Sequence, residues 1–121
     1  MSFDPALYAW TQETLEPLGT VTMRRMMGGA TLYLDGIVFA VIDEAELWFK
    51  GDAQSEAIWD SAGCERFTFT GKEGVTHSMN YRRAPAAVYD DAEAMQHWAA
   101  LAIEAGRRGA AKKRPRRKPA A

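Results

Sequence analysis

The residue types that carry most enzyme chemistry are scarce and far apart in this chain of 121 residues. Cys64 is the single cysteine, and His77 and His97 fall in different predicted elements. A nucleophilic cysteine needs a base within hydrogen-bonding reach, and no C-x-x-C or H-x-x-x-H spacing indicates a metal site. The pattern predicts an unreactive thiol, a core position for His77, a surface position for His97, and no catalytic residue, metal ligand or cofactor.

Two further groups of residues resemble functional motifs without meeting their requirements. Met26-Met27-Gly28-Gly29 lacks the spacing of a phosphate-binding loop and leads into a strand instead of a helix. We therefore interpret its glycines as a bulge or tight bend between strands. Asp43, Glu44 and Glu46 lie in a polar loop without the apolar wall that general acid catalysis requires, which favours a solvated turn.

Arginine and tryptophan side chains supply the candidate contacts for a protein partner. Arg24 and Arg25 would point to opposite faces of a strand, so that one of them approaches the core and needs an acidic partner or a carbonyl. Core packing is the default for the four tryptophans, at positions 10, 48, 59 and 98. Trp48, on a short predicted strand, is also a candidate for an exposed interface anchor.

Charge divides the chain into two parts. Residues 1–106 contain all 16 acidic residues, whereas residues 107–121 contain eight basic residues and no acidic one. A run of like charges with Ala, Gly and Pro buries too little apolar surface to order itself. We therefore predict a folded domain over 1–109 and a disordered basic tail over 110–121. The tail is either a solubilising end or a phosphate-binding arm, with these candidate nucleic-acid contacts: Lys112, Lys113, Arg114, Arg116, Arg117 and Lys118.

Three helices are predicted from their caps and apolar stripes. Asp4 before Pro5 is typical of a helix start, and the first helix should run to about Glu16. A short helix is expected over 53–61. The last helix should begin at a capping box formed by Asp90 and Glu93, and should end at Gly109.

Strands are predicted between these helices, over residues 20–27, 30–34, 37–42, 47–50, 66–70 and 75–81. Asp35-Gly36 between two β-rich runs indicates a type I′ hairpin turn. In the last strand, alternation assigns one apolar side to Val75, His77, Met79 and Tyr81, and a wet side to Thr76, Ser78, Asn80 and Arg82. A helix, three or four strands, a short helix, two strands and a helix predict an α+β fold, with helices packed on an antiparallel sheet.

Several short motifs follow one another in an order that resembles a known family. They are Arg25-Met26-Met27-Gly28-Gly29, Leu34-Asp35-Gly36, Phe39-Ala40, Leu47-Trp48-Phe49-Lys50, Phe67-Thr68-Phe69, Tyr81 with Pro85 four residues later, and a closing helix with Asp91 and Trp98. Over residues 4–106 the chain resembles the N-terminal domain of the TfoX/Sxy competence regulators. The structural motif residues under this resemblance are Gly28, Gly29, Asp35, Gly36, Tyr81, Pro85 and Trp98.

The resemblance implies a two-layer α-β(3)-α-β(2)-α arrangement similar to that of secretion chaperones. It also implies a non-enzymatic regulatory or adaptor domain that acts in transcriptional regulation through protein–protein contacts, with a transcription factor as the candidate partner. The alternative is a nucleic-acid-binding accessory protein that uses the basic tail.

Assembly and location are predicted from the residues. A small sheet with an uncovered face or edge predicts a homodimer. The sequence contains no apolar run long enough to span a bilayer and no basic-then-apolar signal at its start. With a single cysteine, which fits a reducing compartment, these features predict a cytoplasmic protein without a membrane partner.

Overall fold

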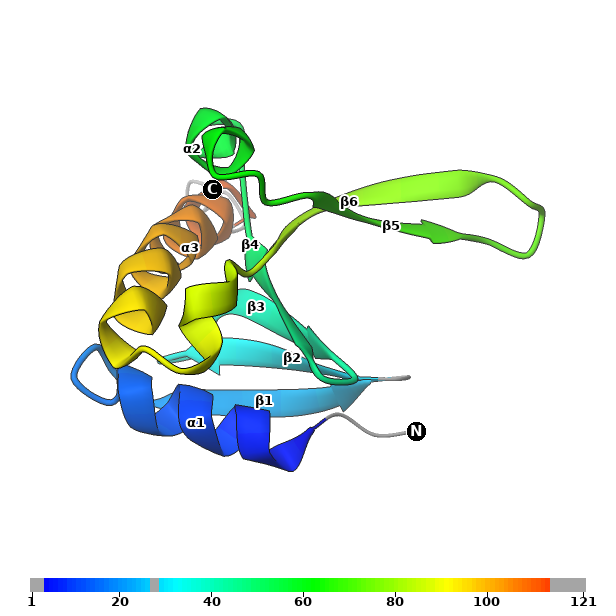
Figure 1. The fold of residues 1–121 in the computed structure, drawn as a ribbon. Coiled ribbons are helices and arrows are strands. Elements are labelled where there is room, and N and C mark those ends of the chain that lie inside the picture. The colour runs from blue at the N-terminus through cyan, green and yellow to red at the C-terminus, as the bar shows by residue number, and fades with distance from the viewer. Residues whose placement is uncertain (1–3, 27–28, 114–121) are drawn as a thin grey trace, which may run out of the picture.

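A computed structural model describes residues 4–26 and 29–113, and shows an α+β domain built on one antiparallel sheet (Figure 1). The elements are α1 (Pro5–Leu15), β1 (Val21–Met26), β2 (Gly29–Leu34), β3 (Ile37–Asp43), β4 (Glu46–Lys50), α2 (Glu56–Ser61), β5 (Arg66–Thr70), β6 (Thr76–Arg83), the 3-10 helix η1 (Ala86–Tyr89) and α3 (Ala92–Lys113). The predicted fold class is confirmed. Four strands, β1 to β4, precede α2. The sequence pattern allowed three or four strands here, and the family resemblance implied three.

The six strands lie in the order β1-β2-β3-β4-β6-β5, with each neighbouring pair antiparallel. Only Tyr81, Arg82 and Arg83 of β6 pair with β4. The remainder of the β5–β6 hairpin, residues 67–79, is paired only with itself and leaves the body on the side away from α3 (Figure 1). We call residues 67–79 the arm.

A single core lies between the sheet and the helices. Buried side chains of β2 to β4 pack against buried side chains of α1, α2 and α3. The largest buried side chains from the strands and the helices are Leu15, Leu32, Leu34, Phe39, Ile42, Leu47, Phe49, Trp59 and Met95. In the described part of the chain no helix covers the opposite side of the sheet. We call that side, with Thr31 and Tyr33 of β2 and Val41 of β3, the open face.

The predicted start of α1 and the predicted hairpin turn are confirmed. The Asp4 side chain accepts hydrogen bonds from the backbone N–H groups of Ala6 and Leu7, and Pro5 occupies the first turn. Asp35 and Gly36 both have positive φ, at 50° and 87°, as a type I′ turn requires. Asp35 also accepts a hydrogen bond from the Thr20 N–H, which ties the turn to the loop before β1.

Both predicted ends of the last helix are wrong. Asp91, and not Asp90, caps α3, because its Oδ1 accepts hydrogen bonds from the N–H groups of Glu93 and Ala94. Gly109 does not end α3, which continues to Lys113. Residues 110–113 of the predicted tail are therefore helical, and residues 114–121 lie outside the described residues.

The predicted faces of the last strand are wrong for several residues. Arg82, assigned to the wet side, is only 3% exposed, whereas Val75 and Met79 on the predicted apolar side are exposed. The reason is that β6 changes surroundings along its length: its end pairs with β4 beside α2, while its beginning belongs to the arm. The side chain of His77 lies outside the described part of the structure, and so does its predicted core position.

Candidate functional site

The open face contains an apolar pocket at the root of the arm. Its volume is about 110 Å³. It is lined from three directions, by the ends of β1 to β3, by Trp48 of β4 and by the arm strands; the lining residues are Met26, Gly29, Val41, Ile42, Asp43, Trp48, Phe67, Met79 and Tyr81. An apolar hollow of this size accepts about one aliphatic side chain, since a cavity of roughly 150 Å³ binds benzene.

Trp48 forms the floor of this region and is not the exposed anchor that the sequence suggested, because only 5% of it is exposed. Phe67 packs edge-on against its indole ring, with 5.0 Å between ring centroids. The Arg83 guanidinium lies 4.6 Å from the centre of the same ring, within the range of a cation–π contact. The indole Nε1 is buried without a hydrogen-bond partner in the described structure.

Arg83 connects the pocket to an acidic rim. Its guanidinium donates hydrogen bonds to the carboxylates of Glu46 and Glu65, the latter at 3.1 Å. Burial lowers the pKa of Arg83, but its bonds to the two glutamates outweigh burial and raise the pKa overall. The side chain is thereby held in place over the Trp48 ring.

Tyr81 lines the pocket next to the end of β4. It pairs with Lys50, whose ammonium nitrogen lies 5.5 Å from the centre of the Tyr81 ring. Burial, and to a lesser degree Tyr33, raise the pKa of the Tyr81 hydroxyl, so it stays protonated at neutral pH. The phenol is therefore a neutral hydrogen-bonding group at the edge of an apolar surface.

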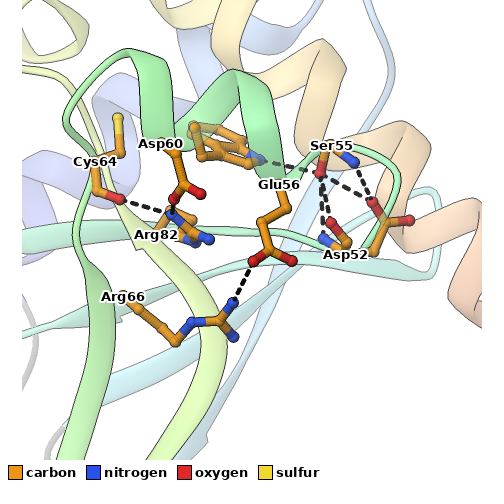
Figure 2. Close-up of polar contacts among 8 residues, drawn as sticks. Asp52, Ser55, Glu56, Asp60, Cys64, Arg66 and Arg82 are labelled. Atoms are coloured by element: carbon orange, nitrogen blue, oxygen red, sulfur yellow. Dashed lines mark hydrogen bonds and ion pairs between the residues drawn. The ribbon is translucent and has the colours of Figure 1, made fainter.

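A polar cluster lies on the core side of β6, beneath α2 (Figure 2). Arg82 donates hydrogen bonds to the Asp60 carboxylate at 2.6 Å and to the Cys64 carbonyl at 3.0 Å. Arg66 lies 3.5 Å from Glu56. These contacts join α2 to the base of the arm, and we assign them a structural role.

A second part of the cluster fixes the loop before α2 to the end of α3. Arg108 donates hydrogen bonds to both carboxylate oxygens of Asp52, at 2.7 and 3.1 Å. Asp52 also accepts from the N–H and hydroxyl of Ser55, whose oxygen accepts from the Trp59 indole. The bond from Arg108 outweighs burial and lowers the pKa of Asp52 to about 2.

Arg24 and Arg25 lie on opposite sides of β1, as predicted, and both side chains are exposed. Arg24 pairs with Thr31 and therefore belongs to the open face, while Arg25 pairs with Ala30 on the helix side. Neither lies in the core, because both are on the second half of β1, where the side chains are exposed. Of the three partner-interface candidates, Arg24 and Trp48 thus share one face.

The family motif residues mostly shape turns and packing. A Cβ on Gly29 would lie 2.1 Å from the Ile42 carbonyl oxygen, so this position requires glycine. Pro85 begins η1, and Trp98 packs on Trp59 with ring centroids 5.3 Å apart. Gly28 lies outside the described residues.

The candidate nucleic-acid contacts divide between α3 and the undescribed residues. Lys112 is exposed on the last turn of α3, and Lys113 ends that helix. The other four candidates, Arg114, Arg116, Arg117 and Lys118, lie outside the described residues. The helix directs its basic end beyond the sheet, next to α2 (Figure 1).

The burial of Cys64 and the arrangement of possible metal ligands bear on the catalytic and metal chemistry considered from the sequence. Cys64 is buried, and burial raises the pKa of its thiol despite the opposing charge of Arg82, in line with an unreactive thiol. Over residues 4–26 and 29–113 no group of three or more His, Cys, Asp or Glu side chains is arranged to hold a metal ion. Within the same residues no helix has the length and apolar character to cross a membrane.

Sequence reasoning missed most of the pocket. Met26 and Phe67 were named only within family motifs, and Met79 only on the apolar side of a strand. None was predicted as an interface residue, because nothing local distinguishes an apolar strand residue that faces solvent from one that faces a core. The only available signal was the run of apolar residues on one side of the last strand, which marks a surface that something must cover.

An open antiparallel sheet with helices on one face and an apolar pocket on the other defines the described residues as a small α+β domain with one uncovered sheet face. The model of the TfoX N-terminal domain family matches residues 13–106, which is most of the chain. The chain therefore belongs to the TfoX N-terminal domain family.

A curated relative supports this membership. The chain is similar to the DNA transformation protein TfoX1 of Aliivibrio fischeri (strain ATCC 700601 / ES114), with 28% identity over 67 residues. The match covers 55% of this chain and 32% of the relative. The matched region thus spans about a third of the relative's length.

Proposed function

We propose that this protein is a competence-regulator-like, non-enzymatic domain that acts in transcriptional regulation through protein–protein contacts made at its open face. Membership of the TfoX N-terminal domain family and similarity to a DNA transformation protein support the regulatory part of the proposal. The observation that carries the contact surface is the apolar pocket, in whose lining Met26 and Met79 are 46% and 42% exposed. Exposed apolar groups that gather at one place mark interaction sites.

The test is to delete the gene in its native host and to complement the deletion with variants. Met26→Glu places a charge at the rim of the pocket. Thr22→Glu is the matched control, because Thr22 is exposed on the same strand and the same face but does not line the pocket. The readouts are the transcripts of DNA-uptake genes and the frequency of transformation.

We expect deletion to lower both readouts, and the wild-type and Thr22→Glu proteins to restore them. Met26→Glu should fail to do so while accumulating to the same level. Readouts that are unchanged by the deletion, or fully restored by Met26→Glu, would contradict the proposal.

The nucleic-acid alternative rests on the extension of α3 to Lys113, which places exposed cations at positions 107 and 112 on a helix leading into the basic tail. If about six charges met phosphates, log K would fall with log salt at a slope of roughly −4 to −5. Replacing the six candidate lysines and arginines with glutamine keeps the chain length and should abolish this dependence. DNA binding that is unchanged by these replacements would refute the alternative.

A further inference from the structure

We propose that the pocket on the open face is filled by the arm of a second copy of this chain, with Val75 entering next to Trp48, so that two copies form a symmetric dimer. The inference rests on the proposed role of the open face as a protein-contact surface and names one of its partners.

The arm presents an exposed apolar side chain, Val75, next to the turn at its tip. Val75 lies at the turn end of β6 and is half exposed, four residues beyond Met79 in the pocket wall. At about 3.3 Å per strand residue, the tip is roughly 13 Å from the pocket of its own chain. A two-stranded hairpin gains stability from packing, so a surface from another molecule would stabilise the outer part of the arm.

The apolar pocket could bury an aliphatic side chain such as Val75. It has the size of about one aliphatic side chain, and its walls are apolar except at Asp43 and the Tyr81 hydroxyl. An incoming tip supplies an aliphatic side chain for this hollow, which would pack against the Trp48 ring.

The turn at the arm tip carries one cation, Lys72, and one anion, Glu73, both exposed. The hydrogen bond from the Gly71 N–H to the Val75 carbonyl closes this turn. The rim of the pocket also carries both signs, with Asp43 in the lining and Arg83 beside Trp48. Placing Val75 in the pocket therefore brings each tip charge to a rim that holds a charge of the opposite sign.

Two-fold symmetry follows from the arrangement. Each chain has one tip and one pocket on the same face, at the two ends of one hairpin. An interface in which tip meets pocket twice is isologous and closes on itself. Each arm then packs along the open face of its partner, and the exposed side chains of Met26 and Met79 become buried in both copies.

The test is sedimentation equilibrium of the full chain from micromolar to near-millimolar concentration, with charge-swap variants. Val75→Lys alters the tip and Met26→Glu alters the pocket. Ser78→Lys is the matched control, because it adds the same charge to the arm on the side away from the open face. All three altered side chains are exposed, and circular dichroism verifies that each variant is folded.

We expect the wild type and Ser78→Lys to dimerise, and Val75→Lys and Met26→Glu each to raise the dissociation constant by about tenfold or more. An equimolar mixture of Val75→Lys and Met26→Glu should dimerise again, because one tip and pocket remain intact and the other contact gains opposite charges. This rescue distinguishes a direct contact from a general loss of stability.

A wild type that stays monomeric throughout would overturn the inference, as would a dimer that is insensitive to both variants, or one that Ser78→Lys disrupts equally. A monomer whose Met26→Glu variant still loses regulation in the host would point to a different protein in the pocket. In that case the proposed function stands and the second copy is excluded.

Discussion

At the scale of single residues, burial separates side chains that the sequence presents as equivalent. Arg82 and Arg83 are adjacent, and each pairs with an exposed carboxylate. Arg82 is almost completely buried, whereas Arg83 is 39% exposed above Trp48. A buried charge depends on its counter-charge far more than a solvated one does.

The two arginines therefore predict different costs for removing their partners. Asp60→Asn leaves the buried Arg82 charge without a counter-charge and should lower the free energy of unfolding by about 1–2 kcal/mol. Glu65→Gln removes one of two partners of Arg83 and should cost less than about 0.5 kcal/mol. Urea unfolding of both variants tests this difference, and equal costs would show that the burial of Arg82 has no energetic weight.

Asp52 predicts an acid dependence of stability. Its folded pKa of about 2 lies below the ordinary value of 3.8, because Arg108 hydrogen-bonds its charged form. The stability it adds is present above about pH 4 and is lost as the pH falls through about 2. At 26% exposure its contribution at neutral pH should be about 1–2 kcal/mol.

The variant that tests this is Asp52→Asn, with Glu104→Gln as control, because Glu104 is exposed and lies 4.0 Å from Arg108. We expect the difference in unfolding free energy between the wild type and Asp52→Asn to shrink as the pH falls from 4 to about 2. Glu104→Gln should change stability by less than about 0.5 kcal/mol. A difference that stays constant across this pH range would argue against the Asp52–Arg108 pair.

At the scale of elements, α3 shows two glycines with opposite roles. A Cβ on Gly106 would lie 2.2 Å from the Val38 carbonyl oxygen, so this glycine allows the helix to approach β3. A Cβ on Gly109 would meet only the Lys50 side chain, at the ordinary distance of 3.5 Å. Gly109 thus lies inside the helix at a position where packing does not require glycine.

Alanine substitutions at these glycines should have opposite signs. Gly106→Ala must displace α3 and should destabilise the domain by about 1–3 kcal/mol, after allowing for the better helix propensity of alanine. Gly109→Ala should stabilise it by up to about 1 kcal/mol. Thermal unfolding followed by circular dichroism measures both, and a destabilising Gly109→Ala would mean that the helix ends at this residue.

The same elements show what could be predicted from the sequence. Asp4-Pro5 and Asp35-Gly36 specify a helix start and a hairpin turn through backbone preferences of the residues themselves, and both predictions are confirmed. Gly109 has the local preference of a helix end, but the tertiary contact of the preceding residue, Arg108, with Asp52 supports a longer helix. Such contacts join residues 56 positions apart and leave no local pattern.

The candidate site was less predictable than the fold for the same reason. Trp48 and Arg24 were identified as interface candidates, and the structure places both on the open face. The arm was not anticipated, because strand propensity is the same whether or not a hairpin leaves the body. Its residues were therefore assigned to a core that does not extend to them.

At the scale of the whole molecule, the described helices stabilise one side of the sheet and leave the other side uncovered. The core, η1 and the Asp52–Arg108 pair hold the helix side together without the open face. In a domain built in this way, side chains on the open face can be substituted while the core, and with it the fold, stays the same.

The central claim is that the pocket beside Trp48 is completed by the arm of a second copy of this chain. Its most direct test is the indole N–H signal of Trp48 in ¹H–¹⁵N spectra of the full chain over a dilution series. Trp10 and Trp59 serve as internal controls, because their N–H groups already donate to the Val88 carbonyl and to Ser55. We predict that the Trp48 indole signal shifts as concentration rises, because the second copy packs against its ring, that the two controls stay in place, and that Met26→Glu abolishes the shift. A Trp48 signal that is constant from micromolar to millimolar concentration would contradict the account.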